Sequence, residues 1–363
     1  MVTGNAIYLV STPLHFLIAS SIALRQREGQ KAHLIFIDQQ DIASHPYLEC
    51  ESRWSDSPFV SRHIFPGRQS RITDKIRTRK AIFRQLARLA KDLAPEEVYV
   101  GNDRRIEFQY LMHEVSRLKP VTGIYMDEGT FTYVGRQDSG SFSDRIIDSA
   151  LKKLTYGFWW RNPPTVGASS WISKAYVAFP KLVHPLLHDK QLHALASDYF
   201  MVAEFRRLAQ IIVEYFKIDS EQLANLDVLL TLPHESVMAR VPGYAEQMRN
   251  LVTTLSARGR KIGVKYHPRN HNPDALELGG YSGVWLIPDG AAYEAFLPLL
   301  GECLVVGDMS TTLLTTRWLR SDLRVVAVKN TESSYFEQFR ALFNQLSIAV
   351  LSPDEVGESI LYE

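Results

Sequence analysis

The sequence has little cysteine, no long uninterrupted hydrophobic run and almost no net charge. Only Cys50 and Cys303 occur among its 363 residues, and they fall in different halves of the chain. Such sparse cysteine usage excludes a small secreted fold held together by disulfides and fits a reducing compartment better. We therefore expect both residues to be buried thiols.

The charges nearly cancel, since 41 Lys and Arg stand against 40 Asp and Glu to give a formal net charge of +1. A chain so balanced has no global attraction to nucleic acid or to a membrane surface. No nucleic-acid partner is expected, and contact with an anionic surface would have to come from a local patch.

The most apolar stretch, residues 6–24, is too interrupted to be a signal peptide or a membrane anchor. Ser11, Thr12, Pro13 and His15 break it, no positive segment precedes it, and no small-residue cleavage pattern follows it. The pattern predicts a strand, a turn and a helix, in which Ser11 or Thr12 caps the helix and Pro13 takes its first position.

Length and composition favour two α/β domains. Hydrophobic residues make up 45% and charged residues 22% of the chain, which is ordinary for a globular enzyme, and its length suits two domains of roughly 150 residues each. Short apolar runs alternate with helix-period segments, which is typical of parallel sheets. The predicted strands cover residues 7–10, 33–37, 97–100, 123–126, 227–232, 261–266, 284–287, 303–306 and 323–328.

This alternation predicts two doubly wound, Rossmann-like domains that face a central cleft. The first is expected over residues 1–165 and the second over 226–363. Residues 166–225 are rich in aromatics without a clear strand pattern, and we expect a helical bridging segment there. Ligands of such domains bind at the carboxyl ends of the strands, so the residues directly after each strand are the ones to inspect.

Two adjacent acids, Asp127 and Glu128, follow a predicted strand and precede Gly129. Side chains alternate along an extended segment, so one carboxylate can point into a cleft while the other holds the surrounding backbone. The pair could then supply a general base and its support. The alternative is an ordinary polar turn in which Gly129 provides a positive φ.

His267 and Pro268 follow a strand of the second half, flanked by Lys265 and Arg269. Pro268 keeps His267 out of helical geometry, so the imidazole can be aimed rigidly at a phosphate, as a cation or as a neutral donor. A structural histidine with satisfied hydrogen bonds is the alternative.

Ser310, Thr311 and Thr312 lie between an apolar strand and a helix-like segment. Free backbone N–H groups, the helix dipole and three hydroxyls would make a phosphate cradle there. The alternative is a plain N-cap, for which serine and threonine are common.

Together these motifs resemble those of the bacterial CMP-sialic-acid-dependent glycosyltransferases of the lipooligosaccharide and capsule type, including polysialyltransferases. That family combines an acidic pair before glycine, a His-Pro motif and a Ser/Thr pair, in this order, on the GT-B fold. The segment with Tyr293 and Glu294 resembles the family's ribose-binding segment, and the run from Leu9 to His15 resembles its opening.

The resemblance implies a role for each residue. Glu128 would be the general base, Asp127 its support and His267 the residue that contacts the CMP phosphate. The remaining residues would bind the donor: Thr12, Pro13, Gly129, Lys265, Pro268, Glu294, Ser310, Thr311 and Thr312. The chain departs from several relatives by having Glu as the base and Ser-Thr-Thr as the hydroxyl set.

The implied activity is an inverting, metal-independent transfer of sialic acid from CMP to a hydroxyl of a bacterial surface glycan, such as lipooligosaccharide, O-antigen or capsule. No cofactor and no metal are expected. Alternatives are a Kdo, legionaminic or pseudaminic acid transferase, a non-catalytic nucleotide- or glycan-binding protein, and a nucleotide-sugar epimerase. We expect a cytoplasmic protein, with a peripheral position on the inner face of the inner membrane as the alternative.

Two segments are candidates for that peripheral contact. Residues 62–91 contain ten Lys or Arg and a single acid, Asp74, and residues 152–161 mix aromatics with cations. Both patterns suit an anionic lipid surface or a charged glycan. The alternatives are a solvated helix face for the first segment and buried packing for the second.

Overall fold

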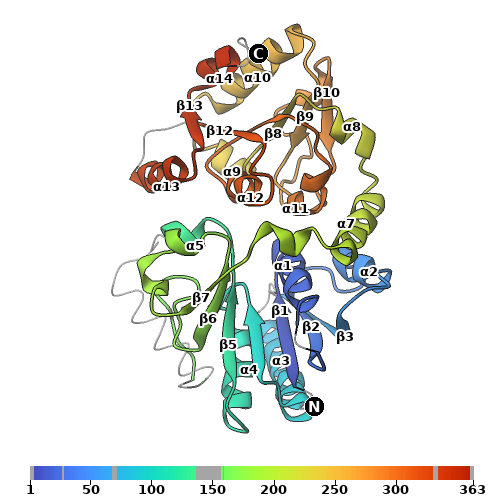
Figure 1. Ribbon diagram of the computed structural model, residues 1–363, viewed down its shortest axis with the longest axis vertical. Helices are drawn as coiled ribbons and strands as arrows, with labels where there is room; N and C mark the ends of the chain where they lie inside the picture. The colour runs from blue at the N-terminus through green and yellow to red at the C-terminus, as the bar shows by residue number, and fades with distance from the viewer. Residues whose placement is uncertain are drawn as a thin grey trace. The chain divides into compact units, whose positions relative to one another are not determined.

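The computed structural model describes residues 4–26, 28–67, 72–135, 157, 159–329 and 334–359. The chain divides into two compact units, Met1–Arg206 and Arg207–Glu363, and each is described by itself. Each contains one parallel sheet with helices between its strands (Figure 1).

Unit 1 is built on a seven-stranded sheet with the order β3-β2-β1-β4-β5-β6-β7. Its strands are β1 (Asn5–Val10), β2 (Lys31–Gln39), β3 (Phe59–Pro66), β4 (Glu97–Val100), β5 (Thr122–Met126), β6 (Ile172–Val177) and β7 (Gln191–Ala194). Its helices are α1 (Pro13–Ala23), α2 (Pro46–Ser52), α3 (Ile72–Leu93), α4 (Ile106–Ser116) and α5 (Phe131–Val134), with short 3₁₀ turns at Pro180–Leu182, Pro185–Leu187 and Ser197–Phe200.

Unit 2 is built on a six-stranded parallel sheet with the order β10-β9-β8-β11-β12-β13. Its strands are β8 (Val228–Thr231), β9 (Ile262–Lys265), β10 (Val284–Ile287), β11 (Leu304–Gly307), β12 (Arg324–Val328) and β13 (Ala349–Leu351). Its helices are α8 (Ser220–Ala224), α9 (Glu235–Met238), α10 (Tyr244–Ala257), α11 (Tyr293–Phe296), α12 (Thr311–Leu319), α13 (Ser334–Gln345) and α14 (Pro353–Ser359), with 3₁₀ turns at Leu278–Gly280 and Leu297–Leu299. Helix α7 (Ala203–Tyr215) begins in unit 1 and ends in unit 2.

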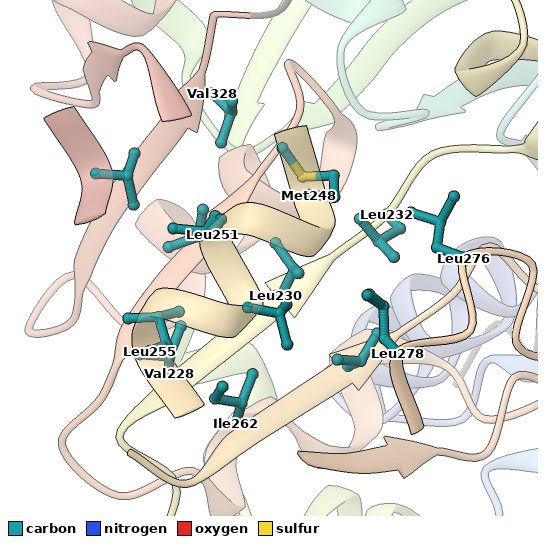
Figure 2. Packing of buried hydrophobic residues seen from close by; sticks show 14 of the residues in the cluster. Val228, Leu230, Leu232, Met248, Leu251, Leu255, Ile262, Leu276, Leu278 and Val328 are labelled. Atoms are coloured by element: carbon teal, nitrogen blue, oxygen red, sulfur yellow. The ribbon is translucent and has the colours of Figure 1, made fainter. Parts of the chain in front are cut away.

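The central strands are buried on both faces, as β4, β8, β9 and β11 show along their whole lengths. Apolar residues on both faces of a strand are typical of parallel sheets covered by helices on each side. In unit 2, Figure 2 shows how Met248, Leu251 and Leu255 of α10 pack over Val228 and Leu230 of β8. This packing fixes the strands, and with them the loops at their carboxyl ends.

The start of the chain folds as predicted. Thr12 is the N-cap of α1, its hydroxyl accepts a hydrogen bond from the His15 N–H at 3.2 Å, and Pro13 follows at the first helical position. Cys50 and Cys303 are free and buried, also as predicted. Within the described residues, no helix combines the length and the apolar character that a membrane crossing requires.

The expected helical bridging segment over residues 166–225 is wrong for its first part. β6 and β7 lie there and extend the first sheet, so unit 1 continues to Arg206. Both strands are only partly buried, and polar residues such as Lys174 and His193 interrupt their apolar pattern. Strands with such mixed patterns, at and next to the edge of a sheet, give a weak sequence signal.

Candidate active-site residues

Asp127 follows β5 and is buried, with only 2% of its surface exposed. Its Oδ1 accepts hydrogen bonds from the Gly129 N–H and the Thr132 hydroxyl, both at 2.8 Å. Its Oδ2 accepts from the Tyr133 hydroxyl and from the Ala178 N–H, which lies just after β6. Burial raises the pKa of Asp127, and these four hydrogen bonds oppose the shift. The carboxylate therefore serves to hold the loop after β5 against the end of β6.

Gly129 has a φ of 87°, so the turn needs a residue without a side chain. The Glu128 N–H donates to the Thr132 hydroxyl at 3.2 Å, which fixes the backbone of Glu128 as well. Glu128 is partly exposed, whereas Asp127 is not. Asp127 is thus turned inward, whereas Glu128 is partly exposed as a residue, although its Oε2 is itself buried.

The turn after β4 contacts Glu128 and was not identified from the sequence. The Asn102 side-chain N–H donates to Glu128 Oε1 at 3.0 Å. The His15 ring of α1 lies directly over Gly101, where an added Cβ would be 2.1 Å from His15 Nε2. Burial lowers the pKa of His15 to about 3, so this ring is neutral. Thr12 and Pro13 lie at the same edge of the sheet, but the Thr12 hydroxyl is used as the cap of α1.

In unit 2, His267 is half-buried just after β9, and its Nδ1 accepts from the Arg269 N–H at 3.2 Å. Burial, reinforced by the nearby charges of Arg269, His234 and Lys265, lowers the pKa of His267 to about 4. The imidazole is therefore neutral at pH 7 and carries its proton on Nε2. It therefore donates a hydrogen bond through Nε2–H and carries no positive charge.

His234, from the loop after β8, is the second histidine of this edge. Its ring stands edge-on to that of His267, with 5.3 Å between ring centroids. His234 Nε2 lies 3.2 Å from the Arg269 carbonyl, and its Nδ1 accepts from the Ser236 N–H at 3.1 Å. The backbone N–H of Arg269 thus contacts one imidazole and its carbonyl the other, while Pro268 and Arg269 themselves are exposed.

Lys265 and Glu294 are both buried in unit 2. The Lys265 ammonium donates to the Asp289 carbonyl at 2.7 Å and to the Tyr266 carbonyl at 3.2 Å. Burial lowers the pKa of Lys265 to about 8 and raises that of Glu294 to about 7, and each charge partly offsets the shift of the other. Lys265 therefore holds the loops after β9 and β10 together beside the first turn of α11, where Glu294 lies.

The hydroxyls of Ser310 and Thr312 lie at the N-terminus of α12, 2.6 Å apart. Thr312 Oγ1 also lies 3.1 Å from Thr231 Oγ1 at the end of β8, so three hydroxyls form a chain. Thr231 was not identified from the sequence. It sits against Gly307, where an added Cβ would be 2.1 Å from Thr231 Oγ1. Thr311 occupies the first position of the helix.

Strand register places these groups along one edge. Thr231 pairs with Lys265 on one side and with Gly307 on the other. His267 therefore follows β9 and Ser310 follows β11, the strands on either side of β8. The axes of β9 and β11 are about 10 Å apart in the sheet. Among the residues that the structure describes, no group of three His, Cys, Asp or Glu side chains could hold a metal ion.

Comparison with solved structures defines the class of fold. The chain is similar to an alpha/beta-galactoside alpha-2,3-sialyltransferase from Photobacterium phosphoreum, with 12% identity, a TM-score of 0.59, and coverage of 98% of this chain and 100% of that one. It is also similar to a putative UDP-N-acetylglucosamine 2-epimerase from Listeria monocytogenes, with 11% identity, a TM-score of 0.56, and coverage of 98% and 87%. A third similar structure is a UDP-GlcNAc 2-epimerase from Methanocaldococcus jannaschii, with 12% identity, a TM-score of 0.56, and coverage of 98% of this chain and 90% of that one. Such low identities establish the fold alone, which is the GT-B class.

The sequence then places the chain within that class. The family model of the alpha-2,8-polysialyltransferases (POLYST) matches residues 6–329, and the chain belongs to this family. It is a glycosyltransferase of the sialyltransferase type, as its motifs indicated. None of the curated proteins matches the chain.

Proposed function

We propose that the enzyme transfers sialic acid, or a related nonulosonic acid, from a CMP donor to a hydroxyl of a bacterial surface glycan, with inversion and without a metal ion. The acceptor class is lipooligosaccharide, O-antigen or capsule. Membership of the polysialyltransferase family supports sugar transfer of this kind. Kdo, legionaminic and pseudaminic acids are alternative donors, since the contacts to CMP would be common to all of them.

The observation that carries the proposal is the set of donors along the edge of the second sheet. The neutral His267 offers Nε2–H on one side of β8. On the other side, Ser310 and Thr312 present hydroxyls at the N-terminus of α12, where the helix dipole favours an anion. A CMP leaving group carries one phosphate, so hydrogen-bond donors of this kind can stabilise it in place of a divalent cation.

Glu128 supplies the other half of the reaction. Its carboxylate takes the proton of the acceptor hydroxyl while that oxygen forms a bond to the anomeric carbon. The bond from the anomeric carbon to the phosphate oxygen breaks, and CMP leaves with the electron pair. His267 and the α12 hydroxyls stabilise the charge that develops on the phosphate. Attack on the face opposite the departing CMP inverts the anomeric centre.

Thermal stabilisation and calorimetric titration with CMP, UDP, GDP and ADP test the donor, each with and without EDTA. We expect CMP alone to stabilise the protein, with equal affinity in EDTA. His267→Ala should weaken CMP binding, whereas His271→Ala, whose side chain is 94% exposed in the same loop, should not. Preference for UDP or GDP, or loss of CMP binding in EDTA, would overturn the proposal.

We also propose that α3 holds the enzyme against anionic lipid headgroups. Five exposed cations, Arg77, Lys80, Arg84, Arg88 and Lys91, recur every three or four residues and so form a row on one face of the helix. Each cation near an anionic membrane surface contributes about 1 kcal/mol. Binding to vesicles with and without phosphatidylglycerol tests this, and the charge-reversed R84E/R88E variant should lose at least about 10-fold in affinity for the anionic vesicles. Equal binding of both proteins would overturn it.

Most of the second candidate segment, residues 152–161, lies outside the described residues. The Trp159 ring stacks on His113 and meets Tyr110 edge-on within unit 1. Trp160 is buried. These two aromatics therefore pack inside unit 1, and the contact with lipid is proposed for α3 alone.

A further inference from the structure

Asn102 lies one strand away from the proposed catalytic base. β4 and β5 are neighbours, and Val100 pairs with Tyr125. The loops that follow therefore run side by side, and Asn102 in one donates to Glu128 Oε1 in the other at 3.0 Å. Glu128 thus receives a donor from a segment of the chain that carries none of the three recognised motifs.

The Asn102 amide is fixed in this orientation. Its Oδ1 accepts from the Arg104 N–H at 3.0 Å, so its side-chain N–H₂ is left to face Glu128. A flipped amide would place the N–H₂ against a backbone N–H and the oxygen against a carboxylate, which would lose both hydrogen bonds.

The turn that carries Asn102 is itself anchored on both sides. On one side the His15 ring packs over Gly101. On the other, the fully buried Asp103 carboxylate accepts from the Gly167 N–H at 2.9 Å and the Ser169 N–H at 2.7 Å. Asn102 is therefore a firmly anchored hydrogen-bond donor for the Glu128 carboxylate.

We propose that Asn102 is a positioning residue for Glu128, which orients the carboxylate toward the proton of the acceptor hydroxyl. The inference rests on the proposed function, in which Glu128 is the general base. A glutamate side chain loses rotamer entropy when it is ordered, and Asn102 removes much of this cost before the acceptor binds. A small misplacement of a reacting group can cost about 100-fold in rate.

The test compares Asn102→Ala and Asn102→Asp with the wild-type enzyme in the transfer from a CMP-sugar to an acceptor glycan. Asn102→Ala should lower kcat about 10- to 100-fold while the Kd for CMP stays unchanged, because CMP is expected to bind unit 2. Asn162→Ala is the matched control. Asn162 is exposed and contacts Arg104 of the same turn from its other side, at 3.1 Å, and its loss should leave kcat unchanged.

Asn102→Asp should change the pH profile of kcat, which would stay the same if Asn102 only stabilised the fold. It places a second carboxylate beside Glu128, and two like charges at this distance favour a shared proton, so the acid limb of the pH profile of kcat should shift upward by about a unit or more. Tyr125, Asp127, Asp103 and Arg104, with His15 over Gly101, are the other ionisable groups around this position, and none of them is altered. An acid limb at the wild-type pH, with full kcat in Asn102→Ala, would overturn the inference.

Folding and function are checked separately. Hydrogen exchange in β4 and β5 reports whether unit 1 stays folded. If Asn102→Ala unfolds, the isosteric Asn102→Asp decides by its pH profile. If the wild-type enzyme neither binds CMP nor transfers a sugar from it, the proposed function fails. If the wild type is active and the Asn102 variants match it, only the role of Asn102 fails.

Discussion

The carboxyl edges of the two sheets hold opposite kinds of polar group. In unit 1 the Asp127 carboxylate is buried after β5 and accepts from backbone N–H groups and hydroxyls. In unit 2 the Lys265 ammonium is buried at the end of β9, beside the buried Glu294, and donates to two carbonyls. Each buried charge fixes the loop after its own strand, and each stands next to a more accessible group, Glu128 in one unit and His267 in the other.

This contrast corresponds to the two halves of the proposed transfer. Unit 1 presents a carboxylate, which can accept a proton from a sugar hydroxyl. Unit 2 presents a neutral imidazole and hydroxyls, which can donate to a phosphate. The same parallel-sheet architecture thus carries two different chemistries, and the difference lies in the few residues that follow each strand.

The largest effects on activity, and the clearest difference between the two edges, are expected from Glu128→Gln and His267→Ala. Each should lower the transfer rate about 10²- to 10⁴-fold, because each removes a group that acts in the transition state. Only His267→Ala should weaken CMP binding, since Glu128 is assigned to the acceptor. Initial rates and calorimetric titration with CMP measure both effects. Equal losses of CMP affinity in the two variants would contradict the division of roles.

Much of this arrangement could be predicted because the motifs directly follow apolar strands. The predicted strand over residues 303–306 closely matches β11, and the helix-like segment expected at this point is α12, so Ser310 was placed correctly at a helix N-terminus. The alternation at Asp127 and Glu128 likewise predicted one inward and one accessible acid. Their catalytic roles stay predictions.

The site residues that the sequence did not identify are those whose role depends on strand order and close packing. Asn102 can be recognised only when β4 is known to lie beside β5, and one sequence does not give that order. Thr231 looks like an ordinary β-branched residue of a buried strand until β11 is placed next to β8. Lys265 was expected to add charge near the phosphate, but it is buried and occupied by backbone carbonyls.

Asp127→Asn should give the next largest effect, on stability. The new N–H₂ group would face donors in place of one carboxylate oxygen, so buried hydrogen bonds would be lost at a cost of about 2–4 kcal/mol in the free energy of unfolding of unit 1. Chemical denaturation followed by hydrogen exchange in β5 and β6 measures it, and unit 2 should be unaffected. Asp92→Asn, at an exposed position of α3, is the control. A similar small change in both variants would show that Asp127 does not hold the loop.

Gly307→Ala should disturb the donor edge of unit 2 to a smaller extent. The added methyl group would meet Thr231 Oγ1 at 2.1 Å, and the resulting shift should cost about 1–3 kcal/mol and displace Thr312. CMP affinity should fall, and Thr231→Ala in the same chain should restore part of the lost stability. Gly280→Ala, which meets nothing within 4 Å, is the control. A double variant no more stable than Gly307→Ala would contradict the steric explanation.

The smallest effect is expected from the titration of His267. Its pKa is lowered from 6.5 to about 4 in the folded protein, so between these values the unfolded state binds the proton more readily, and stability is lost as the pH falls through this window. Glu294 acts in the opposite direction, because its pKa is raised from 4.5 to about 7 and the folded state then takes up the proton first. The difference in unfolding free energy between the wild type and His267→Asn should therefore decrease from pH 6.5 to pH 4, whereas the corresponding difference for Glu294→Gln should increase from pH 7 to pH 4.5. Hydrogen exchange in β8 and β9 at several pH values measures both differences. If both changed in the same direction as the pH falls, the two side chains would not titrate as their burial in unit 2 requires.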